Sequence, residues 1–324
     1  MKTILITGVA GFIGARIAEL LLLDGINVLG IDNFNEYYDP RLKEYRIAQF
    51  SSQKGFTLVR ADITDSETMN TVFAQSKISA VIHLAGMAGI RYSKEHPLEF
   101  ERTNIGGTAI LLRLMQTHHV PSFVFASSSS VYAGNIPPFT EDMKTDSPSS
   151  IYAATKKSAE LLISSYHTLF DIHSVILRYF SVYGPQGRPD MSYFRFIRAI
   201  DEHRPIHIYG DGTQRRDFTF VDDIARGTIA ALKIDGIHIC NLASGGSSHS
   251  LNDLIELIES HLKKKAVRIY ESNDVSDLPS TLADTTRAQK ILRWEPTVQF
   301  ETGISTTLDW HLAHKGFIQG LRND

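Results

Sequence analysis

The first half of the chain alternates short apolar runs with amphipathic stretches, and this alternation constrains the fold more than any other feature. Apolar, β-branched runs indicate buried strands at residues 3–8, 27–32, 57–62, 80–86, 122–128 and 173–180. Apolar residues at helical spacing indicate helices between them, at residues 13–25, 66–76, 103–119 and 151–170. Strands that alternate with helices form right-handed crossovers and a parallel sheet. The sequence therefore predicts an α/β fold, a doubly wound parallel sheet over residues 1–180.

The regular alternation of strands and helices ends after Arg178. The Gly/Pro-rich string "SVYGPQGRPDM" begins a second, smaller α/β region at residues 181–324. Within it we expect helices at residues 192–203, 220–233 and 250–265, the last capped by Ser250. The run "GIHICNLA" predicts a strand that rejoins the main sheet. Parts of residues 217–242 therefore complete the first domain.

Composition excludes several classes of partner. The formal net charge is -3 and 21% of the 324 residues are charged, so no basic excess suggests nucleic acid. Glycine interrupts the N-terminal run "MKTILITGVAGFIG" too early for a signal sequence or a membrane span, and we expect no membrane association. Cys240 is the single cysteine, which fits a buried strand residue in a reducing, cytoplasmic compartment. The 13 histidines show no His-Glu-x-x-His spacing, so we expect no metal.

Three glycines lie between the first strand and the first helix. Gly8, Gly11 and Gly14 allow a tight turn and a close approach of the backbone to a pyrophosphate at the helix N-terminus. The next strand ends in Asp32, whose carboxylate can accept both adenosine ribose hydroxyls and would repel a 2′-phosphate. The alternative for Asp32 is a turn residue in "DNFN". The pattern favours a Rossmann-type domain that binds NAD rather than NADP.

Tyr152 and Lys156 lie four residues apart at the start of a predicted helix, so both side chains share one helix face. An ammonium group beside a phenol favours the phenolate and lowers the pKa of the tyrosine, which would make Tyr152 a proton acceptor. For an isolated pair of this kind, solvated helix surface is the better interpretation, because the pattern often arises by chance. The rest of the chain has to decide.

Together the glycine triplet, the "HLAG" and "SSSSVY" runs and Tyr152-Ala-Ala-Thr-Lys156 resemble the extended short-chain dehydrogenase/reductase family. The strings "DNFNEYYDPRLKEYR", "AGIRYSKEHP", "RYFSVYGPQGRPDM" and "RRDFTFVDDI" are similar to UDP-glucuronate 4-epimerases. The resemblance implies a homodimer that converts UDP-glucuronate to UDP-galacturonate by transient, NAD-dependent oxidation at carbon 4. A UDP-hexose epimerase or another UDP-sugar oxidoreductase is the alternative. A non-enzymatic NAD-binding protein would have no need of the proton acceptor.

The resemblance also implies roles for individual residues. Tyr152 removes a proton from a sugar hydroxyl, Lys156 lowers its pKa and holds the nicotinamide ribose, and Ser128 bonds the same hydroxyl. The expected cofactor-binding residues are Gly8, Gly11, Phe12, Ile13, Gly14, Asp32, Asn33, Asp62, Ile63, Leu84, Ala85, Asn104, Tyr152 and Lys156. The expected substrate-binding residues, mainly in residues 181–324, are Arg91, Ser129, Ser130, Ser181, Arg188, Arg216 and Asp277.

Several of these residues also have structural interpretations. Asp62 is compatible with a helix N-cap and Asn104 with a polar group inside a helix, while His83 is expected to be a packed strand-end residue rather than a catalyst. Either Arg188 or Arg216 could be a surface charge. By resemblance Arg216 binds the diphosphate, and Arg188 could supply a cation near the sugar carboxylate.

The residues around Ser128 favour epimerisation. Related dehydratases need an acid and a base there, and related decarboxylases carry a glutamate two residues before the tyrosine, where this chain has Ser130. Hydroxyls at Ser129, Ser130 and Ser181 can hold a carboxylate but cannot easily drive elimination. The chain departs from these epimerases at Gly86 and Met87, usually alanine and glutamine, and at Asp274, which would repel a diphosphate that it faced.

Overall fold

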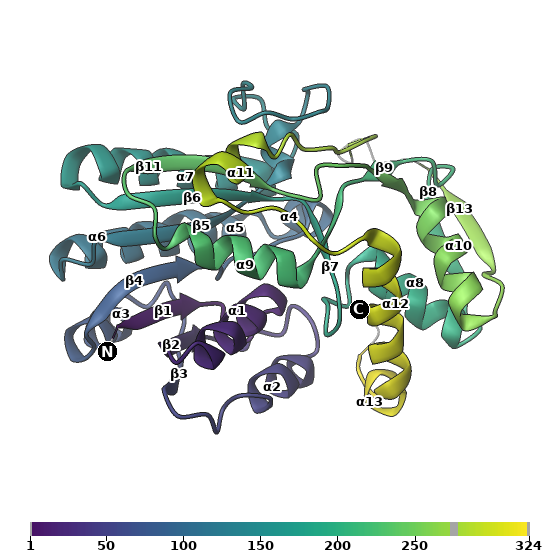
Figure 1. The fold of residues 1–324 in the computed structure, drawn as a ribbon, viewed down its shortest axis with the longest axis horizontal. Helices are drawn as coiled ribbons and strands as arrows, with labels where there is room; N and C mark the ends of the chain where they lie inside the picture. Colours follow the sequence, from purple (N-terminus) through teal and green to yellow (C-terminus); the bar gives the residue numbers. More distant parts are fainter. Residues whose placement is uncertain (1, 273–277, 323–324) are drawn as a thin grey trace.

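The computed structural model describes residues 2–272 and 278–322, and a seven-stranded parallel sheet forms its centre (Figure 1). The strand order is β3-β2-β1-β4-β5-β6-β11, and each neighbouring pair is parallel, with Thr3 of β1 opposite Asn27 of β2. The strands are β1 (Thr3–Thr7), β2 (Asn27–Asp32), β3 (Phe56–Arg60), β4 (Ile78–His83), β5 (Ser122–Ser128), β6 (His173–Tyr179) and β11 (Ile237–Leu242). The predicted fold class is confirmed, and so is the late strand that rejoins the sheet.

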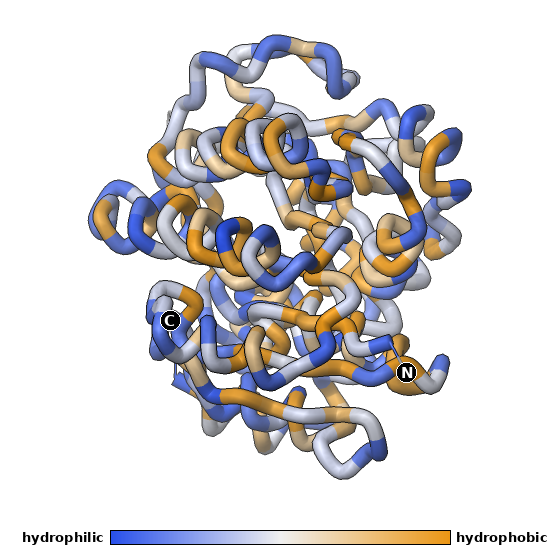
Figure 2. The backbone as a smooth tube through the Cα atoms, turned by 90° about the vertical axis from the view of Figure 1, so that its left-hand side faces the viewer, coloured by the Kyte–Doolittle hydropathy of each residue, from blue (hydrophilic) through white to orange (hydrophobic). Residues whose placement is uncertain are grey.

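Helices cover both faces of this sheet. One face packs against α1 (Phe12–Leu23), α9 (Val221–Ala231) and α11 (Thr286–Leu292). The other packs against α3 (Ser66–Gln75), α6 (Thr108–Thr117) and α7 (Ile151–Phe170). In Figure 2 the helices change repeatedly between hydrophobic and hydrophilic along their length, because only one side of each faces the sheet.

The predicted helix at residues 103–119 has an irregular beginning. A π-helix, η1 (Glu101–Gly107), precedes α6, and a short helix α5 (Pro97–Phe100) precedes η1. Thr108 Oγ1 donates to the Asn104 carbonyl at 2.6 Å, and the Asn104 side chain bonds outside the helix. The widened turn therefore lies where a helix residue reaches towards α7, and π-turns often mark functional sites.

The C-terminal half adds a smaller lobe with its own core, built on α8 (Ser192–Asp201), α10 (Leu251–Leu262) and α12 (Phe300–Ala313). Ser250 caps α10 as predicted, because its hydroxyl accepts from Asp253 N and the Asp253 carboxylate accepts from Ser250 N. Two-stranded sheets pair β7 (Ser181–Tyr183) with β10 (Phe218–Phe220), β9 (Arg215–Arg216) with β12 (His249–Ser250), and β8 (Ile206–Tyr209) with β13 (Arg268–Glu271). The remaining elements are α2 (Pro40–Ala48), α4 (Ile90–Glu95), η2 (Ser129–Tyr132) and α13 (Lys315–Gln319).

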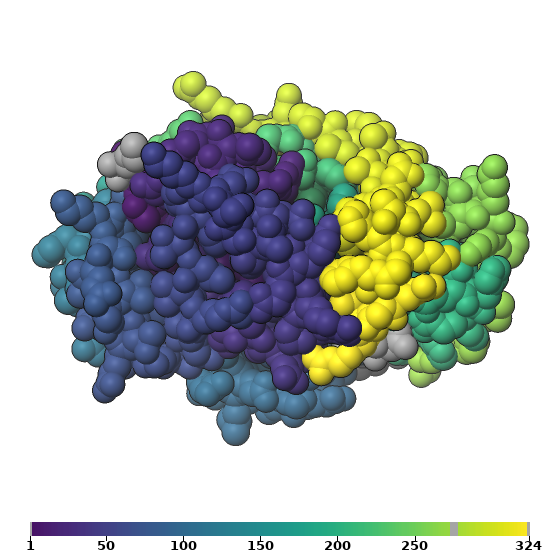
Figure 3. All heavy atoms as spheres, turned by 90° about the horizontal axis from the view of Figure 1, so that it is seen from below, coloured from purple at the N-terminus to yellow at the C-terminus, as the bar shows by residue number. Residues whose placement is uncertain are grey.

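The C-terminal segment ties this lobe to the first domain. Figure 3 shows residues near the C-terminus in yellow against the early residues in dark blue and purple. Arg322 N donates to Asp39 Oδ2 at 2.8 Å, and the Arg41 guanidinium donates to the Gly320 carbonyl. From the lobe itself, Arg198 donates to the Leu321 carbonyl at 2.9 Å. None of the helices in the described ranges is long and apolar enough to cross a bilayer.

Candidate active site

A cavity of about 670 Å³ opens at the carboxyl ends of the central strands. It begins where the chain leaves β1 and β4, the neighbours at which the strand order reverses, and such switch points hold ligands in doubly wound sheets. The predicted site residues that line it are Gly8, Gly11, Phe12, Ile13, Gly14, Asp32, Asn33, Asp62, Ile63, Leu84, Ala85, Arg91, Ser128, Ser129, Ser130, Tyr152, Lys156, Ser181, Arg188 and Arg216. Asn104 lies behind the wall, and Asp274 and Asp277 lie outside the described residues.

The glycine loop fits a bound pyrophosphate. Gly8 has φ +72°, and a Cβ atom there would lie 2.7 Å from Ala85 N. A Cβ atom on Gly14 would overlap the Gly8 carbonyl oxygen, which already accepts from Gly11 N at 3.0 Å. Side chains at these positions would therefore push apart the loop and the start of α1, where backbone N–H groups can meet a phosphate.

Asp32 ends β2 and lies at the wall of the cavity, 8% exposed. Its Oδ2 accepts from Ala10 N at 3.0 Å and its Oδ1 from Phe34 N at 2.8 Å, so the carboxylate is held rigidly beside the glycine loop. Asp62 is not a helix N-cap, because Asp65 caps α3. Instead Asp62 accepts from Asn33 Nδ2 at 2.9 Å at the same end of the cavity.

The sequence-based expectation that the pKa of Tyr152 is lowered is wrong. Burial raises the pKa of Tyr152, and the opposing influences are a hydrogen bond with Ser128 and the charge of Arg188. Lys156 Nζ donates to the Ala126 carbonyl at 2.8 Å and lies 4.9 Å from the centre of the Phe125 ring. The shared helix face is correct, but the ammonium group is turned towards β5 rather than towards the phenol.

Asn104 joins the loop after β4 to the helix that carries Tyr152 and Lys156. Its Oδ1 accepts from Met87 N at 2.8 Å, and its Nδ2 donates to the Met87 carbonyl and to Thr155 Oγ1, both at 3.0 Å. A Cβ atom on Gly86 would lie 2.9 Å from Asn104 Oδ1 and 3.4 Å from Lys156 Nζ. Glycine at position 86 therefore suits this close contact between loop and helix.

His83 is a packed residue, as expected. It is 1% exposed, with Nδ1 2.7 Å from Thr7 Oγ1 and Nε2 3.0 Å from Thr108 Oγ1. Burial lowers the pKa of His83 to about 3, with a smaller contribution from the charge of Lys156. The imidazole is therefore neutral at physiological pH.

Hydroxyl groups gather beside Tyr152. Ser128 Oγ donates to Ser130 Oγ at 3.1 Å and accepts from Ser130 N, which begins the short helix η2. Ser129 and Ser181 also line the cavity. These serine hydroxyls carry no charge, and they offer several hydrogen-bond donors and acceptors to a polar ligand.

Arg188 meets Asp190 at this end of the cavity. Its Nε donates to Asp190 Oδ1 at 3.0 Å and its Nη2 to Asp190 Oδ2 at 2.6 Å, a bidentate pair. Tyr37 OH donates to Asp190 Oδ2 at 3.2 Å, and the guanidinium lies 5.6 Å from the centre of the Tyr37 ring. Arg188 is thus not a surface charge, and its positive charge is paired with the carboxylate of Asp190 in the same loop.

At the far end of the cavity, the Arg91 guanidinium lies 3.5 Å from the centre of the Tyr209 ring. Arg216 comes from the short strand β9 and donates through Nη1 to the Arg215 carbonyl at 2.9 Å. Both arginines line the cavity from opposite lobes. Two cations there can meet a group with more than one negative charge.

Among the residues of the wall that sequence reasoning missed are Tyr37, Lys43 and Asp190, although the strings that contain them were singled out. Lys43 donates to the Asn35 carbonyl at 2.8 Å, and its pKa is lowered to about 8 by burial while the charge of Asp32 acts in the opposite direction. Only the folding of the loop after β2 brings Lys43 to Asp32. The density of Tyr, Asp and Lys in "NEYYDPRLK" is a signal that could have found Tyr37 and Lys43.

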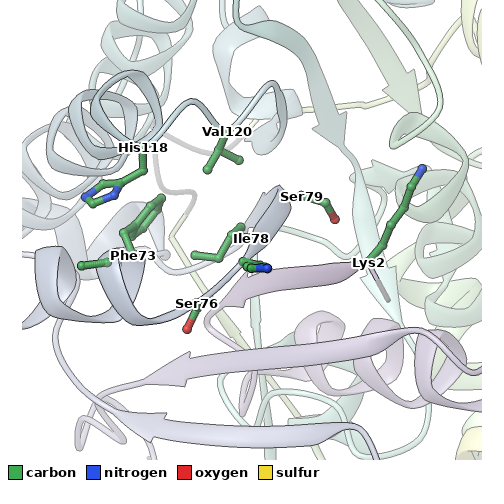
Figure 4. Close-up of a pocket in the computed structure, with 9 residues that line it drawn as sticks. Lys2, Phe73, Ser76, Ile78, Ser79, His118 and Val120 are labelled. Atoms are coloured by element: carbon green, nitrogen blue, oxygen red, sulfur yellow. The ribbon is translucent and has the colours of Figure 1, made fainter.

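A second concavity, of about 770 Å³, lies at the amino ends of β1, β4 and β5 (Figure 4). Its lining includes Lys2, Phe73, Ser76, Ile78, Ser79, His118 and Val120. No predicted site residue lines it, and ligands of such sheets bind at the opposite, carboxyl edge.

Comparisons with known proteins agree with this geometry. The model of the NAD dependent epimerase/dehydratase family matches residues 4–243. A UDP-glucuronate 4-epimerase of Thermodesulfobacterium geofontis is 49% identical over 98% of both chains. The crystal structure of UDP-glucuronic acid 4-epimerase from Bacillus cereus, in complex with UDP-glucuronic acid and NAD, superposes with TM-score 0.91 at 35% identity over 96% of this chain and 99% of that one. UDP-glucose 4-epimerase of Thermotoga maritima, solved with UDP-glucose, gives TM-score 0.86 at 27% identity over 97% and 99%.

Proposed function

Because the chain belongs to the NAD-dependent epimerase/dehydratase family, we propose that it interconverts UDP-glucuronate and UDP-galacturonate by 4-epimerisation. The relative from Thermodesulfobacterium geofontis and the Bacillus cereus structure support this substrate. The observation that carries the proposal is the cavity itself, in which Tyr152 and Lys156 stand beside a cluster of serine hydroxyls and one arginine. We propose that residues 1–180 and parts of 217–242 hold NAD and that most of 181–324 holds the UDP-sugar.

The residues present fit NAD. Gly8, Gly11 and Gly14 leave the space that a pyrophosphate needs, and Asp32 offers a carboxylate to the adenosine ribose. We assign the adenosine end to Asn33, Asp62 and Ile63, and the wall beyond it to Phe12, Ile13, Leu84 and Ala85. When bound, NAD supplies the hydride acceptor and returns the hydride to the sugar.

The proton step belongs to this chain's own residues. Tyr152 accepts the proton of the 4-hydroxyl group, and Ser128 holds that hydroxyl through its Oγ. Burial raises the pKa of Tyr152, and its hydrogen bond with Ser128 acts in the opposite direction. Arg188 and Lys156 are the cations that can lower this pKa.

The surroundings of Ser128 favour epimerisation over loss of water or carbon dioxide. Among the described residues of the cavity wall the acids are Asp32, Asp62 and Asp190. Asp32 and Asp62 stand at the adenosine end, and Asp190 is paired with Arg188. An elimination needs an acid and a base at the sugar, and Ser129 and Ser130 occupy that position instead.

For the sugar carboxylate we propose Ser129, Ser130, Ser181 and Arg188 as partners. For the diphosphate we propose Arg91 and Arg216, which face the cavity from opposite lobes. Asp277 stays a predicted substrate residue outside the described part of the chain.

One observation favours a second candidate, a UDP-hexose 4-epimerase. Arg188 already has the Asp190 carboxylate as a bidentate partner. The charge of Arg188 would therefore stay neutralised when a neutral hexose binds. Met87, buried in the wall where related uronate epimerases have glutamine, makes this end of the cavity less polar.

The test is incubation of the purified protein with UDP-glucuronate, UDP-galacturonate, UDP-glucose and UDP-xylose, with chromatographic separation of the products. We expect UDP-glucuronate and UDP-galacturonate to interconvert with the highest kcat/KM. A higher kcat/KM for UDP-glucose would establish the hexose epimerase instead, and net formation of UDP-xylose would establish a decarboxylase.

We also propose that the protein is a cytoplasmic homodimer. Leu161 and Leu169 on α7 are 58% and 70% exposed, and Leu98 on the neighbouring α5 is 75% exposed. A second copy of the chain would cover such an apolar face. Sedimentation should give twice the mass of the chain, and Leu161→Arg should halve it. The one buried cysteine supports the reducing compartment.

A further inference from the structure

A buried ion pair lies directly behind the proposed catalytic residues. Glu160 follows Lys156 by one turn of α7, and Glu160 and Arg178 are each 1% exposed. Glu160 Oε1 accepts from Arg178 Nε at 2.9 Å, and Oε2 accepts from Arg178 Nη2 at 2.8 Å. Lys157 Nζ adds a weaker contact to Oε2 at 3.3 Å.

The same carboxylate holds the strand that ends in Ser128. Ser127 Oγ donates to Glu160 Oε1 at 2.6 Å, and Lys156 Nζ donates to the Ala126 carbonyl at 2.8 Å. Two residues one turn apart on α7 thus form hydrogen bonds with two consecutive residues of β5. The next residue of β5 is Ser128, whose bond with Tyr152 lowers the pKa of that tyrosine. The position of Ser128 relative to Tyr152 therefore depends on these two bonds.

Stability alone gives a weak reason for this arrangement. A buried ion pair loses much of its Coulomb attraction to desolvation, and apolar residues of similar size often replace it at no cost. Arg178 Nη1 is moreover buried without a hydrogen-bond partner. A fold that needed only packing at this position would do as well without the charges.

We propose that Glu160, itself held by Arg178, is a positioning residue of the epimerisation site, which fixes Ser128 against Tyr152 through Ser127 and keeps Lys156 in its ammonium form. The inference rests on the proposed function for its kinetic consequences. The charge of Lys156 can be followed without any substrate.

The charges around Lys156 carry the second half of this proposal. Burial lowers the pKa of Lys156 to about 8, and the negative charge of Glu160 acts against that fall. From β4, His83 faces Lys156 as a neutral imidazole, and from β6 Arg178 is directed at Glu160. On α7 the other titratable neighbours are Lys157 and Tyr152, and burial raises the pKa of Tyr152. Among these groups, Glu160 supplies the negative charge.

The experiment compares Glu160→Gln with Ser127→Ala. Gln keeps an acceptor for Ser127 but has no charge, so the pKa of Lys156 and the alkaline limb of kcat/KM against pH should both move down by roughly one pH unit. Ser127→Ala keeps the charge of Glu160 but removes its hydrogen bond to β5. We therefore expect kcat to fall on the order of tenfold, with the alkaline limb of kcat/KM unchanged. The pKa of Lys156 is read from the NMR signal of its labelled side chain in the enzyme with NAD.

Two further variants keep the test decisive. Because Glu160→Gln leaves Arg178 as an uncompensated buried charge that can prevent folding, Glu160→Gln/Arg178→Met removes both charges and should shift the pKa of Lys156 in the same direction. Glu259→Gln is the matched control, since Glu259 is also a buried glutamate that accepts from a lysine, at 2.8 Å from Lys265, but on α10. It should lower the melting temperature and leave both readouts unchanged.

The proposal is overturned if folded Glu160 variants titrate Lys156 as the wild type does, or if Ser127→Ala retains full kcat. A wild-type protein without epimerase activity would refute the proposed function only. The pKa of Lys156 in the variants would still decide whether Glu160 sustains its charge.

Discussion

Replacing Arg188 by alanine tests how the site distinguishes a uronate from a hexose. The Arg188 guanidinium now makes two charge-assisted bonds with Asp190, at 3.0 and 2.6 Å. If the sugar carboxylate also contacts this guanidinium, Arg188→Ala removes a bond worth roughly 1.5–3 kcal/mol. At about 1.4 kcal/mol per tenfold change, kcat/KM for UDP-glucuronate should fall roughly tenfold to a hundredfold.

The loss of Arg188 has a second effect, because Asp190 then faces the uronate without its partner. Two like charges about 6 to 12 Å apart repel by roughly 1–3 kcal/mol at an effective dielectric constant of about 20. The variant Arg188→Ala/Asp190→Ala lacks this repulsion and should recover part of the lost kcat/KM. UDP-glucose has no carboxylate, so in either variant its kcat/KM should fall only through the weaker influence of Arg188 on the pKa of Tyr152, and in Arg188→Ala it should fall less than kcat/KM for UDP-glucuronate.

The assay is steady-state kinetics of wild type, both single variants and the double variant on the two substrates, read as a double-mutant cycle. Equal losses on both substrates would refute a carboxylate contact. Full recovery of UDP-glucuronate turnover in the double variant would also refute it, since Arg188 would then serve only to neutralise Asp190.

Three further predictions concern the cofactor, the base and the core. Asp32→Ala should narrow the preference for NAD over NADP, measured by titration of both into stripped protein; equal wild-type affinities would contradict the role of Asp32. Tyr152→Phe should abolish turnover while calorimetry shows UDP-sugar and NAD binding largely intact, and a Phe variant with near wild-type turnover would mean that another group is the base. Because the pKa of His83 is about 3 in the folded protein and near 6.5 unfolded, the unfolded chain binds more protons between these values. The free energy of unfolding should therefore fall as pH drops from about 6.5 to 3, by up to about 5 kcal/mol, and His83→Gln should flatten this dependence in urea titrations; an unchanged slope would refute the buried neutral imidazole.

The central sheet could be predicted because its strands carry their own signal. Runs such as "TILIT" and "HSVILRY" have a continuous apolar centre, as strands covered on both faces commonly do. The pairing of β8 with β13 had no such signal, since His207, Tyr209 and Tyr270 alternate with apolar residues on a partly exposed surface. Their pairing depends on α10 between them and was not visible in either segment alone.

The catalytic helix shows the same limit at the level of single side chains. Spacing places Tyr152, Lys156 and Glu160 on one face, because they recur every four residues. Spacing does not say where a long, flexible ammonium group ends. The Ala126 carbonyl decides that, and it belongs to a strand some 30 residues earlier in the chain, whose position next to α7 is a property of the folded sheet.

Three cations of the cavity share a feature that bears on selectivity. Each has a protein anion near it: Lys43 has Asp32, Lys156 has Glu160 and Arg188 has Asp190. A ligand therefore enters by sharing or exchanging partners rather than by neutralising an isolated charge, and the net gain is the difference between two similar interactions. At Arg188 that difference exists only for a substrate with its own carboxylate. Discrimination between uronate and hexose should consequently depend as much on how firmly Tyr37 and Asp190 retain Arg188 as on Arg188 itself, and Tyr37→Phe, which removes the bond to Asp190 Oδ2, should alter kcat/KM for UDP-glucuronate more than for UDP-glucose.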